Sequence, residues 1–306
     1  DKSINVLCSC GKDCGAKESG VQAIPDDFLK WFVNNPSCEQ ISVEEIYFHG
    51  SGYYKASELS EQEKEKYSFM KEYKIKLGEA PALIVHRNSI EKAAEKGTIL
   101  FYHGLKACKE TNMKELVSLA ERGFLAAGID NAGHGERSYS DLEERMKKNN
   151  SFEETFLTMV RQTSEEIPLV IDELVKKGIT DPEKIGVCGI SMGGYITYGS
   201  VLYEKRIKAI APVLGSPKWK SSINSSPQNH PEKFYPVALL AQNAGQDSCV
   251  PPQFARDFHR VLLPYYKESP ERISYIEYPR SDHFMIEEEW NELWKNVLLW
   301  FETFIN

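Results

Sequence analysis

The sequence predicts an α/β fold with a doubly wound, mostly parallel sheet, antiparallel strands at its N-terminal edge and a short cap. Two observations lead to this prediction. From Gly97 onward, short apolar runs alternate with longer segments of helical periodicity, an order typical of parallel sheets covered by helices. Before that point, residues 67–77 alternate apolar and charged side chains, and residues 80–85 follow after a Gly-Glu turn. This pattern indicates antiparallel strands near a sheet edge.

The individual elements follow from the same patterns. Buried strands are expected over residues 98–102, 124–129, 185–189, 207–214, 237–242 and 273–278, and helices over 113–122, 151–177, 193–203, the segment after Pro252 and the Trp-rich C-terminal segment. Pro168 is expected to kink the helix over 151–177 or to divide it in two. Residues 216–236 show no apolar period and are expected to form a loop or small cap.

The length suits one main domain with an appendage. A chain of 306 residues, 41% of them hydrophobic, can bury a large core. Residues 41–306 are assigned to this main domain. Residues 1–40 are expected to be an N-terminal extension packed on it, anchored by Trp31 and Phe32.

The charge distribution excludes some classes of partner. The formal charge of −8 comes from acidic residues spread along the chain, so no basic stripe is available for a phosphate backbone, and nucleic acid is not expected. No run approaches the roughly 18 apolar residues that span a bilayer. We expect a cytoplasmic protein, with a removed leader left open because the chain begins at Asp1. The oligomeric state is not indicated.

The seven cysteines are unevenly placed. Three residues, Cys108, Cys188 and Cys249, are scattered along the chain and are expected to be buried apolar thiols. The other four lie near the N-terminus: Cys8, Cys10, Cys14 and Cys38. Their spacing matches no common zinc site, so no stoichiometric zinc is expected; a disulfide with Cys38 and free thiols remain open.

The strongest functional motif is G-x-S-x-G at residues 189–193, between a β-branched strand and a helical pattern. A sharp strand-to-helix turn exposes the central serine above the sheet, and glycines on either side prevent steric collision. Ser191 is therefore the candidate nucleophile.

A serine needs a base and an orienting carboxylate to become nucleophilic. His283 follows the last expected strand and is the candidate base, because His49, His86, His230 and His259 are more simply surface residues. Asp247 follows the preceding strand after a Gly-containing turn, so the order along the chain is Ser, Asp, His. Asp282 is the rival acid, but its side chain should point away from the neighbouring ring.

An oxyanion requires two backbone N–H donors. We expect these from Met192, directly after the nucleophile, and from Leu105, in the turn after the strand over 98–102. Gly104 allows a close approach of the backbone, and His103 is expected to be a structural brace.

These residues resemble the α/β-hydrolase superfamily from about Gly97 to the C-terminus, in particular small bacterial carboxylesterases related to prolyl oligopeptidases and dienelactone hydrolases. The resemblance rests on residues 101–104, 134–137, 189–194, 247–251 and 282–283. It implies hydrolysis of a small-molecule carboxylic ester through an acyl-enzyme on Ser191, with no metal or organic cofactor. Dienelactone hydrolases use a cysteine nucleophile, and this sequence has Ser191 instead.

Several alternatives stay open beside an esterase for small or medium acyl groups. A peptidase or thioesterase would use the same triad, and a non-catalytic binding protein could keep the same fold. Arg137 could hold a substrate carboxylate, although an Arg–Glu brace is the simpler interpretation. Five residues could line an acyl pocket or equally well be ordinary packing: Tyr139, Trp219, Phe234, Phe284 and Met285.

Overall fold

The strands of the protein form one mixed sheet. The computed structural model describes residues 44–49, 52–55, 60, 68–87, 89–147, 152–220 and 223–305. Within these ranges, ten strands lie in the order β10-β9-β8-β7-β5-β6-β4-β3-β1-β2. Their bounds are β1 (Glu44–His49), β2 (Gly52–Lys55), β3 (Ser68–Leu77), β4 (Ala80–His86), β5 (Thr98–Tyr102), β6 (Leu125–Ile129), β7 (Ile185–Ile190), β8 (Ile207–Val213), β9 (Ala238–Ala244) and β10 (Ile273–Tyr278).

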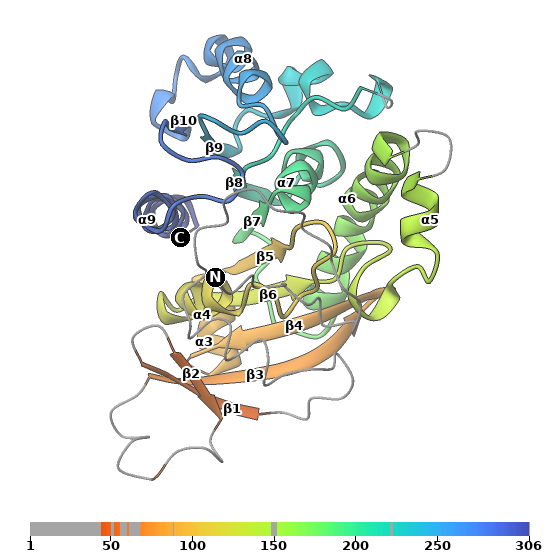
Figure 1. Ribbon diagram of the computed structural model, residues 1–306. Coiled ribbons are helices and arrows are strands. Elements are labelled where there is room, and N and C mark those ends of the chain that lie inside the picture. Colours follow the sequence, from red (N-terminus) through yellow and green to blue (C-terminus); the bar gives the residue numbers. More distant parts are fainter. Residues whose placement is uncertain are drawn as a thin grey trace.

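The pairing of the strands confirms the predicted fold class. Strands β5 to β10 pair in parallel, whereas β4 pairs antiparallel with β6 and continues into the antiparallel strands β3, β1 and β2 (Figure 1). The sequence patterns did not predict β1, β2 or the short helix α3 (Ile90–Lys96). The predicted extension over residues 1–40, with its four cysteines, lies outside the described residues.

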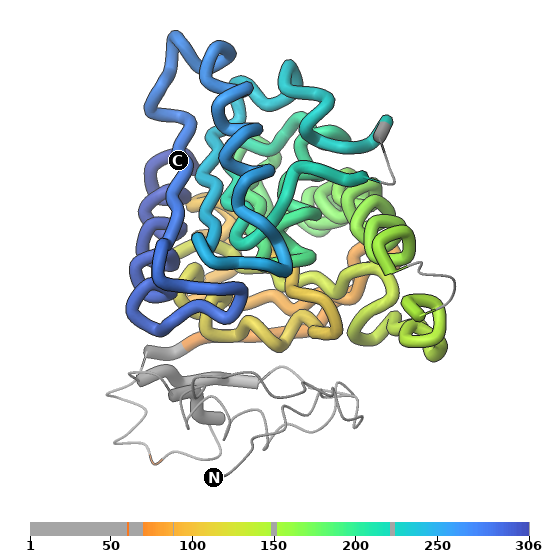
Figure 2. The backbone as a smooth tube through the Cα atoms, turned by 45° about the horizontal axis from the view of Figure 1, so that its top comes forward, coloured from red at the N-terminus to blue at the C-terminus, as the bar shows by residue number. Residues whose placement is uncertain are grey.

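Helices cover both faces of the sheet. They are α4 (Met113–Glu121), α5 (Leu142–Lys147), α6 (Phe152–Lys176), α7 (Met192–Tyr203), α8 (Gln253–Leu262) and α9 (Glu287–Phe304). One apolar cluster joins the sheet to α6, α7 and α8, and a second joins it to α4 and α9. Leu100 and Tyr102 of β5 belong to the first cluster, and Ile99 and Phe101 to the second, as the alternation of a strand requires. In both ribbon and tube views, α9 and α6 accordingly lie on opposite sides of the strands (Figures 1 and 2).

The long helix α6 is continuous through Pro168, so of the two expected effects the division in two is wrong, and a kink stays a prediction. Buried side chains lie on both sides of the proline, among them Ile167 and Val170. Because this apolar face packs on the sheet before and after Pro168, tertiary contacts offset the loss of one backbone hydrogen bond.

The segment after β8 contains three short 3-10 helices, at Ile223–Ser225, Pro227–Asn229 and Pro231–Lys233. They correspond to the predicted small cap. Two of its aromatic residues, Trp219 and Phe234, are fully buried. These side chains therefore pack against the domain and do not line an open pocket.

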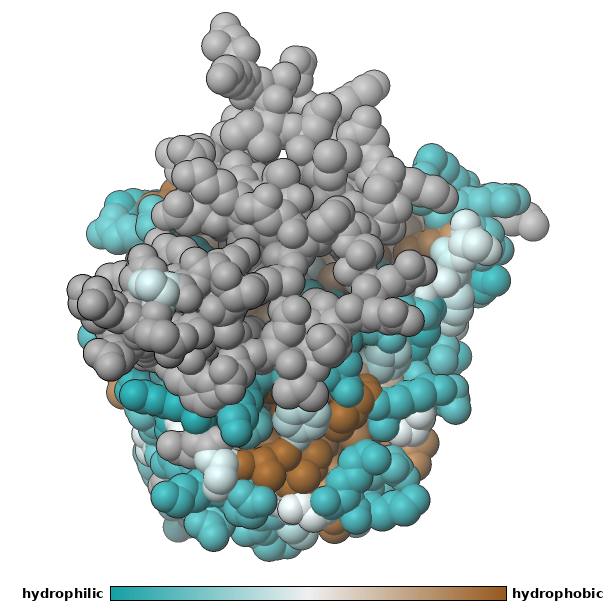
Figure 3. Space-filling view, turned by 90° about the horizontal axis from the view of Figure 1, so that it is seen from below, coloured by the Kyte–Doolittle hydropathy of each residue, from teal (hydrophilic) through white to brown (hydrophobic). Residues whose placement is uncertain are grey.

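Seen from below, the described side chains in the lower half of the view include an apolar area bordered by hydrophilic residues (Figure 3). In the part of the chain that the structure describes, no helix combines the length and apolar character needed to cross a membrane.

The carboxyl ends of the parallel strands meet at one edge of the sheet, where ligands bind in open α/β folds. The turn between β3 and β4 reaches the same edge, because Ala82 near the start of β4 pairs with Ile129 at the end of β6. This edge carries the candidate site.

Candidate active site

Ser191 lies in a tight turn between β7 and α7. Its backbone has φ 56° and ψ −113°, a conformation that non-glycine residues rarely adopt. The turn is closed by backbone contacts: a Cβ added to Gly193 would lie 1.9 Å from the carbonyl oxygen of Tyr102, and one added to Gly189 would lie 2.4 Å from the oxygen of Gly193. Only glycine fits at these two positions, which explains the spacing of the motif.

The three side chains predicted to form a triad lie together, although Ser191 and His283 are 92 positions apart in the sequence. Ser191 Oγ lies 3.0 Å from His283 Nε2, and His283 Nδ1 lies 2.7 Å from Asp247 Oδ2. A carboxylate can only accept, so Nδ1 carries the proton that faces Asp247, and Nε2 is free to accept the serine proton.

The carboxylate of Asp247 is fixed independently of the histidine. Its Oδ1 accepts hydrogen bonds from the backbone N–H groups of Cys249 at 2.9 Å and Val250 at 2.8 Å. The carboxylate is completely buried, so these donors satisfy an otherwise costly charge. The rival Asp282 instead accepts from the N–H of Phe284 within its own turn.

The loop that carries His283 is held by a buried glutamate that the sequence patterns did not indicate. Glu289, near the start of α9, accepts a hydrogen bond from the hydroxyl of Ser281, and the carbonyl of Ser281 accepts from the N–H of Gln246 at 2.9 Å. Glu289 is only 4% exposed. A buried acid eight residues after Ser281 in sequence has no local signature, because its role depends on how α9 returns to the sheet.

The turn after β5 brings Gly104 close to the serine. A Cβ added to Gly104 would lie 3.8 Å from the Cβ of Ser191, an ordinary contact distance. Among the described residues, the backbone N–H groups of Leu105 and Met192 donate to no protein acceptor. Gly104, the residue before Leu105, thus lies close to Ser191, and the oxyanion hole formed by the amides of Leu105 and Met192 stays a prediction.

His103 is a neutral brace, as expected. Its Nε2 accepts from the N–H of Asn131 at 3.1 Å, so Nδ1 carries the proton and donates to the carbonyl of Gly104 at 2.7 Å. Burial, reinforced by the nearby His134, lowers the pKa of His103 from 6.5 to about 3. Burial likewise lowers the pKa of His134.

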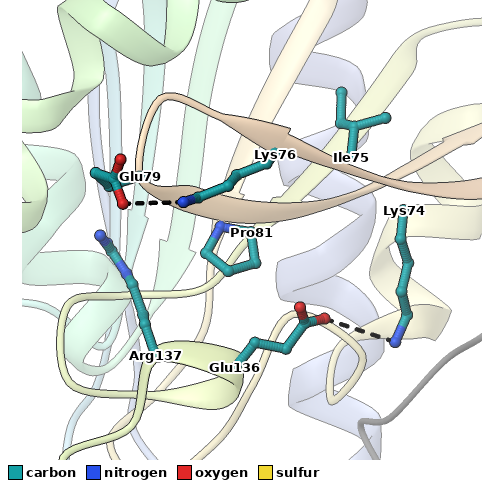
Figure 4. Close-up of a pocket in the computed structure, with 7 residues that line it drawn as sticks. All are labelled: Lys74, Ile75, Lys76, Glu79, Pro81, Glu136 and Arg137. Atoms are coloured by element: carbon teal, nitrogen blue, oxygen red, sulfur yellow. Dashed lines mark hydrogen bonds and ion pairs between the residues drawn. The ribbon is translucent and has the colours of Figure 1, made fainter.

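Arg137 also acts as a brace. Its guanidinium pairs with Glu166 at 2.7 Å, and its Nε donates to the carbonyl of Asp130 at 3.1 Å. Arg137 borders a surface pocket beside the β3–β4 turn, where Lys76 pairs with Glu79 (Figure 4). These pairings favour the Arg–Glu brace over a substrate carboxylate site.

The described cysteines differ from one another. Cys108 and Cys188 are buried, and burial raises the pKa of Cys188. Cys249 is exposed, so the expectation that all three thiols are buried is wrong for this residue. Cys249 lies in the loop that follows β9, two residues after Asp247, and not in a buried strand. Over the described ranges, no group of three or more His, Cys, Asp or Glu side chains is arranged to hold a metal ion.

Phe284 stands out among the candidate pocket residues. Its side chain is 79% exposed, and its ring lies edge-on to that of His283 with 5.7 Å between centroids. A large exposed aromatic side chain beside the triad is suited to contact an apolar substrate group.

Comparisons with known proteins agree with this geometry. The profile of the Prolyl oligopeptidase family matches residues 110–226. Among solved structures, TT1662 from Thermus thermophilus is similar with a TM-score of 0.63 and 20% identity, over 78% of this chain and 98% of that one. The chain has the α/β-hydrolase fold.

The chain is similar to proteins of two kinds. It is 27% identical to the Bacillus subtilis (strain 168) protein named "Putative esterase YitV", over 68% of this chain and 89% of the relative. It is similar in structure to the acylaminoacyl peptidase of Pyrococcus horikoshii, with a TM-score of 0.58 and 16% identity, over 85% of this chain but only 46% of that one. The fold and the resemblance inferred from the motifs are confirmed.

Proposed function

We propose that the protein is a serine esterase that cleaves carboxylic esters of small or medium acyl groups through an acyl-enzyme on Ser191. The observation that carries the proposal is the hydrogen-bonded line from Ser191 Oγ through His283 to Asp247, at 3.0 Å and 2.7 Å. The esterase relative supports the choice of substrate class.

The geometry supports a two-stage reaction. In the first stage, Ser191 Oγ attacks the ester carbonyl carbon while His283 Nε2 takes the hydroxyl proton. The carbonyl oxygen becomes an oxyanion that accepts hydrogen bonds from the amides of Leu105 and Met192. The oxyanion then re-forms the carbonyl and the bond to the alkoxide breaks. His283 gives its proton to the alkoxide, which leaves as an alcohol, and the acyl group stays on Ser191 as an ester. In the second stage, a water molecule gives a proton to His283 Nε2 and attacks the acyl carbon. The bond from that carbon to Ser191 Oγ then breaks, His283 returns the proton to Oγ, and the acid is released.

A peptidase with the same triad is the second candidate, because the matched profile is that of the Prolyl oligopeptidase family. A thioesterase would also use the same steps. The leaving group distinguishes the three, so we would compare p-nitrophenyl esters, an acyl thioester and short peptide p-nitroanilides at equal acyl groups. A preference for the anilide would replace the esterase proposal by the peptidase one.

The test of the nucleophile is labelling with a fluorophosphonate followed by peptide mapping. We expect label on Ser191 in the native protein and none in His283→Ala, because the hydroxyl is activated only by its base. Label on another residue, or an unlabelled but folded native protein, would contradict the proposal.

A matched pair of variants identifies the acid. Asp247→Asn should lower kcat by roughly 10³–10⁴-fold, since the wrong histidine tautomer is then favoured. Asp282→Asn makes the same replacement of a carboxylate by an amide, next to His283 in sequence. It should keep kcat within about twofold, because Asp282 accepts its hydrogen bond from Phe284 within its own turn. Equal losses in the two variants would count against Asp247 as the acid.

A further inference from the structure

The turn that carries Leu105 is held on both sides by two consecutive residues at the carboxyl end of β6. On one side, Asn131 donates its backbone N–H to His103 Nε2 at 3.1 Å and its side-chain amide to the carbonyl of His103 at 2.9 Å. On the other side, Asp130 Oδ1 accepts the backbone N–H of Lys109 at 2.8 Å. Leu105 lies between these two attachments.

Asp130 is anchored by further charged and polar contacts. Its side chain is completely buried, and its Oδ2 accepts from Lys109 Nζ and from the N–H of Glu136, each at 3.0 Å. Lys109 Nζ also lies 2.6 Å from the Glu136 carboxylate. Burial opposes the charge of Lys109, but Asp130, Glu110 and Glu136 together raise its pKa above the ordinary value. Lys109 is therefore charged at physiological pH, while burial raises the pKa of its partner Asp130.

The segment that follows β6 wraps closely around the carboxylate. A Cβ added to Gly135 would collide with Asp130, at 2.1 Å from its Cγ. Glu136 also faces Lys74 of β3 across the pocket beside the β3–β4 turn, at 3.8 Å (Figure 4). Asp130 is thus fixed between the turn after β5 and the antiparallel edge of the sheet.

The turn itself is strained. The N–H of Ala107 donates to the carbonyl of Gly104 at 3.3 Å, and Lys106 has φ 61°. A positive φ at this position of a turn favours glycine, and a lysine there persists only where the surroundings over-determine the conformation. The buried side chain of Asn131 gives its amide to His103 and leaves Oδ1 without a protein donor, so its bonding serves this turn.

We propose that Asp130 and Asn131 are positioning residues that set the Leu105 amide against the oxyanion. The inference rests on the proposed esterase function. Loosening either attachment moves a donor that acts only when charge develops on the substrate oxygen, and loss of one such donor typically costs about 10²–10³ in rate. KM changes little, because the ground-state ester makes weaker use of the donor.

The experiment compares Asp130→Asn and Asn131→Ala with Glu204→Gln. Glu204 is a suitable control because it is also a buried carboxylate that accepts from a backbone N–H and a cation, both of Arg206. It lies between α7 and β8, at the opposite edge of the sheet. Asn131→Ala introduces no unpaired charge and carries the test if Asp130→Asn does not fold.

Three measurements are made on each variant. Hydrogen exchange of residues 103–109 reports whether the turn is held. Hydrolysis of p-nitrophenyl butyrate gives kcat and KM, and a trifluoromethyl ketone gives the affinity for a tetrahedral adduct. The pH profile of kcat/KM reports the His283–Asp247 pair.

We expect both positioning variants to exchange faster over 103–109 and to lose kcat by about 10–100-fold, with KM within about threefold. Affinity for the ketone should fall in parallel with kcat, and the pH profile should keep its shape. Glu204→Gln should keep kcat. Unchanged exchange of the turn, or a kcat loss matched by Glu204→Gln, would overturn the inference. A native protein that neither hydrolyses the ester nor takes the fluorophosphonate label would instead overturn the esterase proposal, while the exchange data would still show whether Asp130 holds the turn.

Discussion

Two strained turns meet at the candidate site, and they are held in different ways. The turn at Ser191 is forced by backbone contacts, because glycines at 189 and 193 leave no space for a Cβ. The turn at Leu105 has a lysine at its positive-φ position. It is held by Asp130 and Asn131, which directly follow β6 and are distant from the turn in sequence. A turn that is held by steric contact can be recognised in the sequence from the glycines beside it. A turn that is held by side chains from a distant segment has no such local signature.

The largest effect is expected from Gly193→Ala, which tests whether the Ser191 turn is held by steric contact. The added Cβ would overlap the carbonyl of Tyr102 at 1.9 Å, so we expect a loss of roughly 3 kcal/mol or more in the free energy of unfolding, measured by urea denaturation. Gly178→Ala is the matched control: it has φ 70° but no atom within 4 Å of the added Cβ, and should cost only about 1 kcal/mol. Similar losses for the two variants would show that the Ser191 turn is not held by steric contact.

Lowering the pH should reduce the free energy of unfolding through His103, one of the polar residues that hold the Leu105 turn. The pKa of His103 is about 3 in the folded protein and 6.5 ordinarily, so below pH 6.5 the unfolded chain binds a proton that the folded protein does not. Stability therefore falls as the pH drops from 6.5 towards 3, by up to about 1.4 kcal/mol per pH unit from this residue. Above pH 6.5 this contribution is constant.

The slope is measured from urea unfolding between pH 6.5 and 4.5 in the native protein and in His103→Gln. We expect the variant to have the shallower slope, since glutamine does not titrate. His230→Gln removes a more exposed imidazole and should leave most of the slope in place. Identical slopes for native protein and His103→Gln would mean that His103 is not held neutral in the fold.

The smallest expected effect comes from relieving the strain at Lys106. Lys106→Gly should raise the free energy of unfolding by up to about 1 kcal/mol, because glycine adopts φ 61° without steric cost. Lys106→Ala serves as control: it also removes the ion pair with Glu143, at 3.4 Å, but keeps the strain. If Lys106→Gly is no more stable than Lys106→Ala in thermal unfolding, the turn stores no strain at this residue.

Local patterns were informative where one segment determines its own conformation. The bounds of β3, β5, β10, α4 and α6 agree with the predicted ones to within one or two residues, because apolar period and flanking glycines act over neighbouring residues. Local rules left two outcomes open at Pro168, and packing on both sides kept α6 continuous. They failed at Cys249, whose exposure depends on how the Asp247 loop lies.

The sequence by itself determined the order of the strands β3 to β10 and of the helices α4, α6, α7, α8 and α9, the turn at Ser191, and the succession of Ser191, Asp247 and His283 after three strands. These features follow from short-range sterics and from a fold in which functional groups occupy the carboxyl ends of strands. Only the tertiary structure decided that His283 lies 3.0 Å from Ser191, that Glu289 holds the loop of His283, and that Asp130 and Asn131 hold the turn of Leu105. The physical reason is that a hydrogen bond between distant segments depends on the pairing of β5 with β6 and on the return of α9, and neither segment carries that information alone.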